Sequence, residues 1–338
     1  METKRLYLDQ NGQNSLETAA HILKNGGVVA IPTETVYGLA ASALDGNAIT
    51  KVFSAKGRPQ DNPLIVHIDS IGMLKKIAKN IPEKAFLCAE KFWPGPLTMV
   101  LESSGYVSSQ VSCGLSTVAV RMPSDKIARK VIGMSGLPLA APSANASGSP
   151  SPTSPMHVLD DLDGKIDAVI MGENCQVGVE STVISVKEDG ARLLRPGAVT
   201  LEMLKEIFPD IAVDKAILSE PEKDEQVASP GMKYKHYAPK TTLYLVNGDS
   251  ESFCDFVNNK NGVALCFKNE AQKIKGKTFV YGDEENEEVM AQTIFAVLRT
   301  LDKEKIEAAY VHAPKKCGVG LAVYNRLIRA CAFRVIDL

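Results

Sequence analysis

The sequence lacks the features that would place this chain in a membrane, outside the cell or around a structural metal. No window of its 338 residues approaches the ~18 apolar residues of a membrane span, and the N-terminal METKRLYLDQ has no apolar signal core. The 7 cysteines are odd in number and form no C-x-x-C pair and no cluster with histidine. We therefore expect a cytoplasmic protein with reduced thiols and no zinc site.

Positive charge is not in excess, and the common nucleotide-binding and hydrolase signatures are missing. The 38 Lys and Arg residues are balanced by 40 Asp and Glu residues, which argues against a dedicated nucleic-acid coat. There is no Walker A pattern, no G-x-G-x-x-G after the first strand of the C-terminal part, and no Ser-His-Asp or metal-ligand spacing. We expect no metal held by protein ligands alone.

What the sequence has is an alternation of apolar runs and amphipathic segments up to residue 208. Several apolar runs follow one another directly, which favours a mixed α/β sheet over a purely parallel one. Capping signals predict helices that begin at Ser15 and Asn47, the second ending at Gly57. Strands are expected at 28–31, 64–68, 97–101, 117–122, 137–141, 167–172 and 181–186, and further helices near 70–79, 82–92 and 200–208.

A polar, acidic stretch, ILSEPEKDEQVASP, separates this part from a second α/β pattern. Its composition is that of an exposed linker, and SPGMKYKHYAPK (229–240) follows it. Strands and helices then alternate in a way that indicates a smaller, doubly wound, Rossmann-like domain. The predicted organisation is a main domain over 1–208, a linker over 209–240 and a C-terminal α/β domain over 241–338.

Lys56 and Arg58 flank the glycine at a predicted helix end, in KGRPQDNPLIVHI (56–68). One interpretation is structural, because Lys and Arg compensate the dipole at a helix C-terminus. The other is a grip on phosphate or carboxylate, because Arg offers a planar fork of donors and loops at strand ends carry ligands. Asn62 and His67 lie in the same stretch, where a half-buried structural role is the commoner interpretation of a lone histidine.

Three further segments place hydroxyls or cations at strand ends. Thr35 lies in PTETVYGLA, which forms either a self-satisfied turn or the wall of a polar pocket. Arg121 lies in an apolar strand and needs either an ion-pair partner or an anionic ligand. Ser181 and Arg195 each border an apolar run. Together with the two cations above, these residues indicate a site for a phosphorylated ligand.

APSANASGSPSPTSP (141–155) has the composition of a spacer. It follows GLPLAA, however, which is expected to be a strand. Ser143 and Asn145 would then lie just beyond a strand end, where side-chain donors can meet phosphate or ribose. A ligand loop made of small residues explains the stretch better than a tether does.

Seven segments occur in an order that resembles a known family: IPTETVYGLA, KGRPQDNPLIVHI, FWPGPLT, VAVRMPS, APSANASGSPSPT, ESTVISV and LLRPGAV. They resemble the threonylcarbamoyl-AMP synthases with the YrdC-like fold, with the K-x-R (Lys56, Arg58) and S-x-N (Ser143, Asn145) signatures intact. SPGMKYKHYAPK and the module after it resemble the longer, two-domain branch of that family. The resemblance covers essentially the whole chain.

The resemblance implies a reaction in which L-threonine, bicarbonate or CO2 and ATP give threonylcarbamoyl-AMP and pyrophosphate. A separate transferase complex would then move the threonylcarbamoyl group to the adenosine next to the anticodon of ANN-reading tRNAs. Direct tRNA binding by this chain is expected to be weak or absent. Mg²⁺ is expected with ATP, held by phosphates and water.

The resemblance also implies roles for individual residues. Lys56 and Arg58 would be catalytic, stabilising the charge that grows as pyrophosphate leaves. L-Threonine would be held by Thr35, His67, Arg121, Ala141 and Ser181. ATP would be held by Lys56, Arg58, Asn62, Thr117, Ser143, Asn145, Ser151, Arg195 and Tyr234, the last from a linker that could fold over the cleft as a lid.

Two other functions are compatible with the sequence. One is an RNA-binding module that uses the same basic cleft. The other keeps the fold but makes a carbamoyl-adenylate from another carbamoyl source, like the related domain of hydrogenase maturation.

Overall fold

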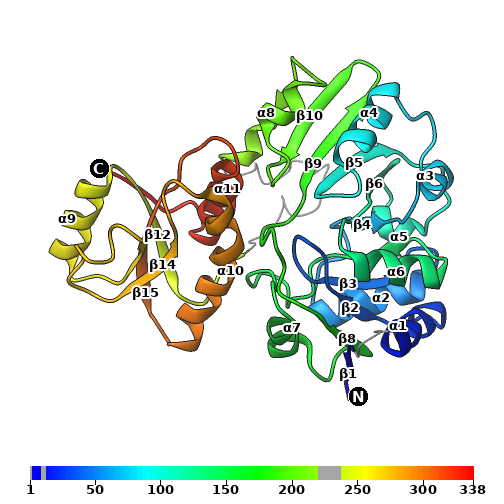
Figure 1. The fold of residues 1–338 in the computed structure, drawn as a ribbon, viewed down its shortest axis with the longest axis horizontal. Coiled ribbons are helices and arrows are strands. Elements are labelled where there is room, and N and C mark those ends of the chain that lie inside the picture. Colours follow the sequence, from blue (N-terminus) through cyan, green and yellow to red (C-terminus); the bar gives the residue numbers. More distant parts are fainter. Residues whose placement is uncertain (1, 9–12, 220–236) are drawn as a thin grey trace.

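The computed structural model describes residues 2–8, 13–219 and 237–338, whose strands form two sheets (Figure 1). The larger sheet has 11 strands and the smaller one has five. None of the helices in these ranges combines the length and the apolar character needed to cross a bilayer. The larger sheet contains β1 (Lys4–Tyr7), β2 (Val29–Ile31), β3 (Gly38–Ser42), β4 (Ile65–His67), β5 (Leu97–Glu102), β6 (Thr117–Arg121), β7 (Leu139–Ala140), β8 (Ala168–Met171), β9 (Thr182–Lys187), β10 (Gly190–Arg195) and β11 (Ala212–Val213).

Neighbouring strands of the larger sheet run in both directions, in the order β1-β8-β2-β3-β7-β4-β6-β5-β9-β10-β11. β4 pairs with β6 in parallel, whereas β7 pairs antiparallel with both β3 and β4. The mixed α/β sheet predicted from the sequence is confirmed. β2, β3 and β4 are buried along their whole length, which explains why their residues are apolar or small, apart from His67 at the end of β4.

The helices of this part begin and end partly where the sequence predicts. α2 ends at Gly57, whose φ is 62°, as predicted, but its N-cap is Asp45, whose side chain accepts a hydrogen bond from the Asn47 amide (2.9 Å). Ser15 is not a cap either, because it lies inside α1 and its hydroxyl donates to the Tyr7 carbonyl. The helices are α1 (Gln13–Lys24), α2 (Gly46–Lys56), α3 (Ile71–Ile77), α4 (Glu83–Phe92), α5 (Ser109–Ser112), α6 (Lys126–Ser135), α7 (Pro155–Leu162) and α8 (Leu201–Lys205).

Several elements have no counterpart among the expected ones: β1, β3, β10, α5, α6 and α7. The sequence of β3 is GLAAS, which contains none of the β-branched or aromatic residues that mark strands. The sequence of β10, GARLLR, carries two arginines that obscure its apolar pair. Tertiary pairing with β2 and β9 outweighs this weak local preference.

The C-terminal sheet is parallel throughout, in the order β14-β13-β15-β12-β16. Leu243 and Leu245 pack under α10 and α11, whereas Val246 packs with Phe253 of α9 on the other face. Helices therefore cover both faces, and the predicted doubly wound domain is confirmed. Its elements are β12 (Thr242–Asn247), α9 (Ser250–Lys260), β13 (Ala264–Phe267), β14 (Thr278–Gly282), α10 (Glu287–Lys303), β15 (Ala308–His312), α11 (Gly320–Ala330) and β16 (Val335–Asp337).

The first part of the stretch expected to be an exposed linker is folded. β11 pairs with β10, and a 3-10 helix, η1 (Lys215–Ile217), follows it. Ala216 and Ile217 are buried, and their carbonyls accept hydrogen bonds from Arg329 (2.7 Å) and Asn325 (2.7 Å) of α11. The composition of residues 209–240 predicted an exposed linker and gave no sign that its first part packs against β10 and α11.

Helices α10 and α11 lie between the C-terminal sheet and the first domain (Figure 1). Val36 and Val179 of the first domain belong to the same hydrophobic cluster as the residues of these helices. Gly178 has a φ of 80° and lies so close to α10 that a Cβ atom there would meet the Ala291 carbonyl oxygen at 2.3 Å. The two domains therefore share a packed interface.

Candidate active site

A cleft that is partly open to solvent lies where several strands of the larger sheet end. Because β4 and β6 are parallel and pair His67 with Arg121, both strands bring their last residues to this edge. The lining residues are Thr33, Thr35, Val36, Gly38, Arg58, Pro63, Leu64, Ile65, His67, Arg121, Ala141, Pro142, Ser143, Glu180, Ser181, Arg195 and Tyr237.

All the residues predicted to hold threonine line this cleft, and Arg121 is the cation among them. Its Nη2 lies 2.7 Å from Glu34 Oε1, and its Nη1 donates to Thr35 Oγ1 (2.8 Å). The ion pair that was one interpretation of Arg121 is therefore present. The guanidinium has five N–H donors, so these contacts leave it capable of also binding a ligand carboxylate.

Burial and the Arg121 charge together determine the pKa of two groups beside Arg121. Burial alone would raise the pKa of Glu34, but the charge and hydrogen bond of Arg121 outweigh it and hold that pKa below its ordinary value. Burial, reinforced by the Arg121 charge, lowers the pKa of His67 to about 3. His67 is therefore uncharged at neutral pH. A carboxylate ligand would meet the positive charge of Arg121 and, beside it, a neutral imidazole.

Three residues predicted to hold ATP, Arg58, Ser143 and Arg195, also line the cleft. Arg195 donates from Nε to the Ser181 carbonyl (3.0 Å) and from Nη2 to Ser181 Oγ (3.2 Å). Burial lowers the pKa of Arg58 to about 10, so that it is still charged at neutral pH. Arg195 thus links the predicted nucleotide side of the cleft to the predicted threonine side.

Positive charge predominates in the cleft lining. Among the described residues that form it, there are three arginines and a single carboxylate, that of Glu180. With His67 neutral, the balance is +2 (3 − 1). Such a cleft suits a polyanion.

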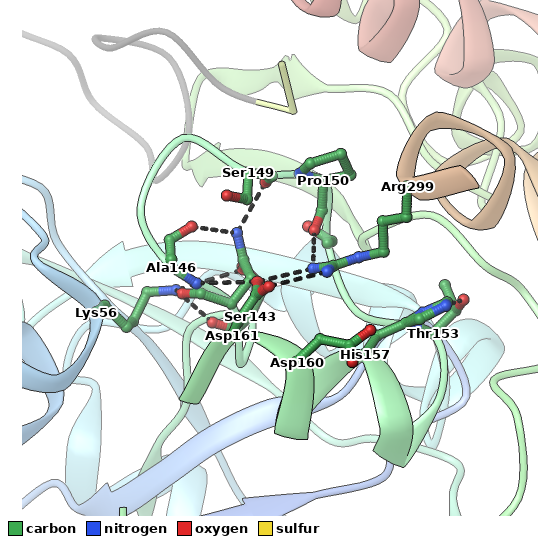
Figure 2. Close-up of polar contacts among 12 residues, drawn as sticks. Lys56, Ser143, Ala146, Ser149, Pro150, Thr153, His157, Asp160, Asp161 and Arg299 are labelled. Carbon is green, nitrogen blue, oxygen red and sulfur yellow. Dashed lines mark hydrogen bonds and ion pairs between the residues drawn. The ribbon is translucent and has the colours of Figure 1, made fainter. Parts of the chain in front are cut away.

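Neither Lys56 nor Asn145 is among the residues that line the cleft. Asn145 belongs to the loop of residues 143–151, and Figure 2 shows the Lys56 side chain pointing toward Ser143 of that loop. The Lys56 ammonium donates to the carbonyls of Ser143 (2.5 Å) and Asn145 (2.6 Å). The Asn145 amide donates to the carbonyls of Ala146 (2.9 Å) and Ser149 (2.8 Å). Burial lowers the pKa of Lys56 well below its ordinary value. These side chains fix the shape of the loop.

Ser151 is buried and joins the cleft to the C-terminal domain. Its hydroxyl donates to Glu180 Oε1, and Glu180 Oε2 accepts from Arg326 Nε of α11 (2.9 Å). Arg326 is fully buried and also donates to the Pro196 carbonyl (2.7 Å). Burial would raise the pKa of Glu180, but Arg326 and Arg195 outweigh it and hold that pKa below its ordinary value.

The remaining predicted ATP ligands differ in their placement. Asn62 is buried and is not among the residues that line the cleft, and its Nδ2 has no hydrogen-bond partner among the described residues. Thr117 is the first residue of β6, whereas Arg121 is the last, so Thr117 lies at the other end of that strand from the cleft. Tyr234 falls outside the described residues, and the Tyr237 that follows it in the same segment lines the cleft.

Sequence reasoning gave no individual role to Glu34 or Glu180, and it noted Tyr237 only as one of the aromatic residues of a segment that could fold over the cleft. Each glutamate directly precedes a residue predicted to hold threonine, in PTETVYG and GVESTV. A carboxylate next to apolar residues indicates a buried ion pair, and both segments contain such a carboxylate. Within the described ranges, no group of three His, Cys, Asp or Glu side chains could hold a metal ion.

Both domains match known protein families. Residues 21–197 match the family model described as "Telomere recombination", and residues 199–332 match that described as "Threonylcarbamoyl-AMP synthase, C-terminal domain". The chain is 43% identical to the threonylcarbamoyl-AMP synthase of Pyrococcus abyssi over 96% of each chain. It is 41% identical to that of Bacillus subtilis over 99% of this chain and 100% of the relative.

A solved structure agrees with these matches. The crystal structure of P. abyssi Sua5 complexed with L-threonine superposes with a TM-score of 0.89 at 39% identity, covering 100% of both chains. The likeness thus extends over the cleft, the interface and the C-terminal sheet. On these matches the chain belongs to the threonylcarbamoyl-AMP synthase family.

Proposed function

We propose that this chain converts L-threonine, bicarbonate or CO2 and ATP into threonylcarbamoyl-AMP and pyrophosphate. The observation that carries the proposal is that one cleft collects Arg58, Arg121 and Arg195 from three separate segments, beside the hydroxyls of Thr35 and Ser181. A zwitterionic amino acid and a polyphosphate both need such donors. The free state of all seven cysteines is compatible with a reaction in the cytoplasm.

The threonine subsite would lie around Arg121. The guanidinium pairs with the ligand carboxylate, while Thr35 and Ser181 offer hydroxyls and Ala141 a backbone contact. His67, neutral at this site, can act as a hydrogen-bond donor or acceptor without adding charge. This division of roles follows the family resemblance.

The nucleotide subsite would lie between Arg58, Arg195 and the 143–151 loop. Ser143 offers a hydroxyl from the cleft wall. Lys56 would act through the loop, since its ammonium binds two loop carbonyls. Mg²⁺ would enter as part of the substrate, bound to the ATP phosphates.

The amine nitrogen of L-threonine first bonds to the carbon of CO2 and loses a proton, which gives N-carboxy-threonine; with bicarbonate as the carbon source, water is released as well. The next step is a displacement at phosphorus. A carboxylate oxygen of N-carboxy-threonine bonds to the α-phosphorus, the bond from that phosphorus to the bridging oxygen breaks, and pyrophosphate leaves with the electron pair. Arg58 and Arg195 stabilise the charge that develops on the phosphate oxygens. Catalysis then consists mainly of holding the carboxylate ~3–3.5 Å from phosphorus.

Pyrophosphate release tests the proposal. The purified chain is incubated with ATP and bicarbonate, with and without L-threonine. We expect release that depends on threonine. Release that does not depend on threonine would support a carbamoyl-adenylate enzyme with another carbamoyl source. RNA affinity that falls steeply with salt, without turnover of ATP, would support the RNA-binding alternative.

The product would serve a separate transferase complex that modifies the adenosine next to the anticodon of ANN-reading tRNAs. Direct tRNA binding by this chain would be weak, because its net charge is −2. Adding the product to that complex and unmodified tRNA, and following the modified nucleoside by mass spectrometry, tests this step.

A further inference from the structure

An arginine of the C-terminal domain reaches the loop that carries the S-x-N signature (Figure 2). Arg299 of α10 makes two parallel contacts with Asp161 of α7, Nη1 to Oδ1 at 3.0 Å and Nη2 to Oδ2 at 2.8 Å. Its Nη2 also donates to the Pro150 carbonyl (2.5 Å). One side chain therefore binds both the helix after the loop and the loop backbone itself.

Asp161 also contacts the loop itself, at a residue nearer its start. Its Oδ2 accepts a hydrogen bond from the Ala146 amide (3.1 Å), next to Asn145. The loop is thus held at Ala146 through Asp161 and at Pro150 directly, both by way of Arg299. The Ala238 amide adds a contact to the Gly148 carbonyl (2.9 Å) from the segment that enters the C-terminal domain.

Burial distinguishes this pair from a surface ion pair. The Arg299 and Asp161 side chains are 8% and 13% exposed. On the same two helices, Lys303 and Asp160 form a second ion pair of 2.9 Å, whose side chains are 63% and 37% exposed. A buried, bidentate pair loses much when one partner is removed, whereas an exposed pair contributes little.

A second arginine fixes the next residue of the loop. Arg326 of α11 holds Glu180, which accepts the hydroxyl of Ser151. Two helices of the C-terminal domain thus hold consecutive residues of the loop, Pro150 and Ser151. We propose that Arg299 is a positioning residue for the nucleotide subsite, and that a role of the C-terminal domain is to hold the 143–151 loop in its binding conformation.

This inference rests on the proposed function, because it takes the loop to bind ATP. The threonine subsite around Arg121 receives none of these Arg299 contacts. Loss of Arg299 should therefore weaken ATP binding selectively. A merely structural role would reduce the stability of the protein and affect both ligands together or neither.

The test compares Arg299→Gln with Lys303→Gln, which removes the exposed pair on the same helices. Calorimetry measures the Kd of α,β-methylene-ATP and of L-threonine, and steady-state kinetics gives both KM values. For Arg299→Gln we expect the Kd and KM of the nucleotide to rise about tenfold or more, with the threonine Kd changed by less than about twofold. Lys303→Gln should change each by less than about twofold.

Hydrogen exchange of the loop amides checks the cause, and we expect faster exchange at 143–151 in Arg299→Gln. If that variant does not fold, Arg299→Lys replaces it, because lysine keeps the charge but loses the fork. Unchanged nucleotide binding, or equal losses for both ligands, overturns the positioning role. Wild-type protein that releases no threonine-dependent pyrophosphate would instead overturn the proposed function, while the comparison of nucleotide Kd values still tests the loop.

Discussion

At the scale of single residues, the cleft is built from buried charges that each have a defined partner. Arg121 faces Glu34, Glu180 faces Arg326, and Lys56 binds loop carbonyls. Buried charges without such partners would carry a large desolvation cost. The same pairs hold the arginine side chains in fixed positions before a ligand enters.

The buried histidine gives a prediction about stability and pH. The pKa of His67 is about 3 in the folded protein, because of burial and then Arg121, and about 6.5 in an unfolded chain. Between these values the unfolded chain binds a proton that the folded protein does not, so stability falls as pH drops below about 6.5. From pH 8 to pH 5, wild type should lose about 2 kcal/mol more free energy of unfolding than His67→Gln.

Urea unfolding of both proteins at the two pH values measures this difference. Burial also lowers the pKa of His157, to about 4. Because both proteins contain His157, its contribution to the change in unfolding free energy cancels in the comparison. Equal losses in wild type and His67→Gln would mean that His67 titrates normally.

Ser143 gives a prediction about ATP. It lines the cleft, and no hydrogen bond ties its hydroxyl to another side chain in the described part of the chain. Ser143→Ala should change the free energy of unfolding by less than about 0.5 kcal/mol. The KM for ATP should rise about tenfold, because a hydrogen bond to a charged phosphate is lost. An unchanged KM for ATP would mean that Ser143 does not contact the nucleotide, and it would support the interpretation of residues 141–155 as a spacer.

At the scale of elements, the side-chain amide of Asn145 holds the 143–151 loop from within, in addition to the contacts from Lys56, Asp161 and Arg299. Asn145 donates to the carbonyls of Ala146 and Ser149 and accepts weakly from Lys56 (3.4 Å). Asn145→Ala should lower the free energy of unfolding by about 1–3 kcal/mol and raise the KM for ATP, while the threonine Kd is kept. Ser149→Ala is the matched control, because it leaves the accepting carbonyl in place. Identical nucleotide KM values for the two variants would contradict this account of the loop.

The elements also show what a sequence reveals. Buried strands such as β4 and β6 were predicted because continuous apolar runs mark them, and Gly57 was predicted because a left-handed helix end favours glycine. β3 was missed because GLAAS has weak strand preference and is held by pairing with β2 and β7. Of the 17 residues that line the cleft, eight were predicted through their motifs to hold a ligand. Glu34 and Glu180 were not, because their partners Arg121 and Arg326 are distant in the chain.

At the scale of the whole molecule, the two domains are joined through close packing at α10. Gly178 and Gly114 have almost the same positive φ, 80° and 81°. A Cβ atom at Gly178 would lie 2.3 Å from Ala291 and Gln292 backbone atoms, whereas at Gly114 nothing lies within 4 Å. The difference between alanine variants at these sites therefore isolates the interface from backbone strain.

Gly114→Ala should lower the free energy of unfolding by about 1–2 kcal/mol, the cost of the left-handed conformation. Gly178→Ala should lower it by about 1–3 kcal/mol more, because the interface must move apart. Urea unfolding measures both. If the two variants are equally stable, the domains are not packed as described.

The central claim is that the cleft joins threonine and a carbon from bicarbonate to AMP. The direct measurement is mass spectrometry of the product formed from ATP, L-threonine and ¹³C-bicarbonate. We predict threonylcarbamoyl-AMP that carries the label in its carbamoyl carbon and is absent when threonine is omitted. An adenylate without threonine, or unlabelled product in the presence of saturating labelled bicarbonate, would contradict the account.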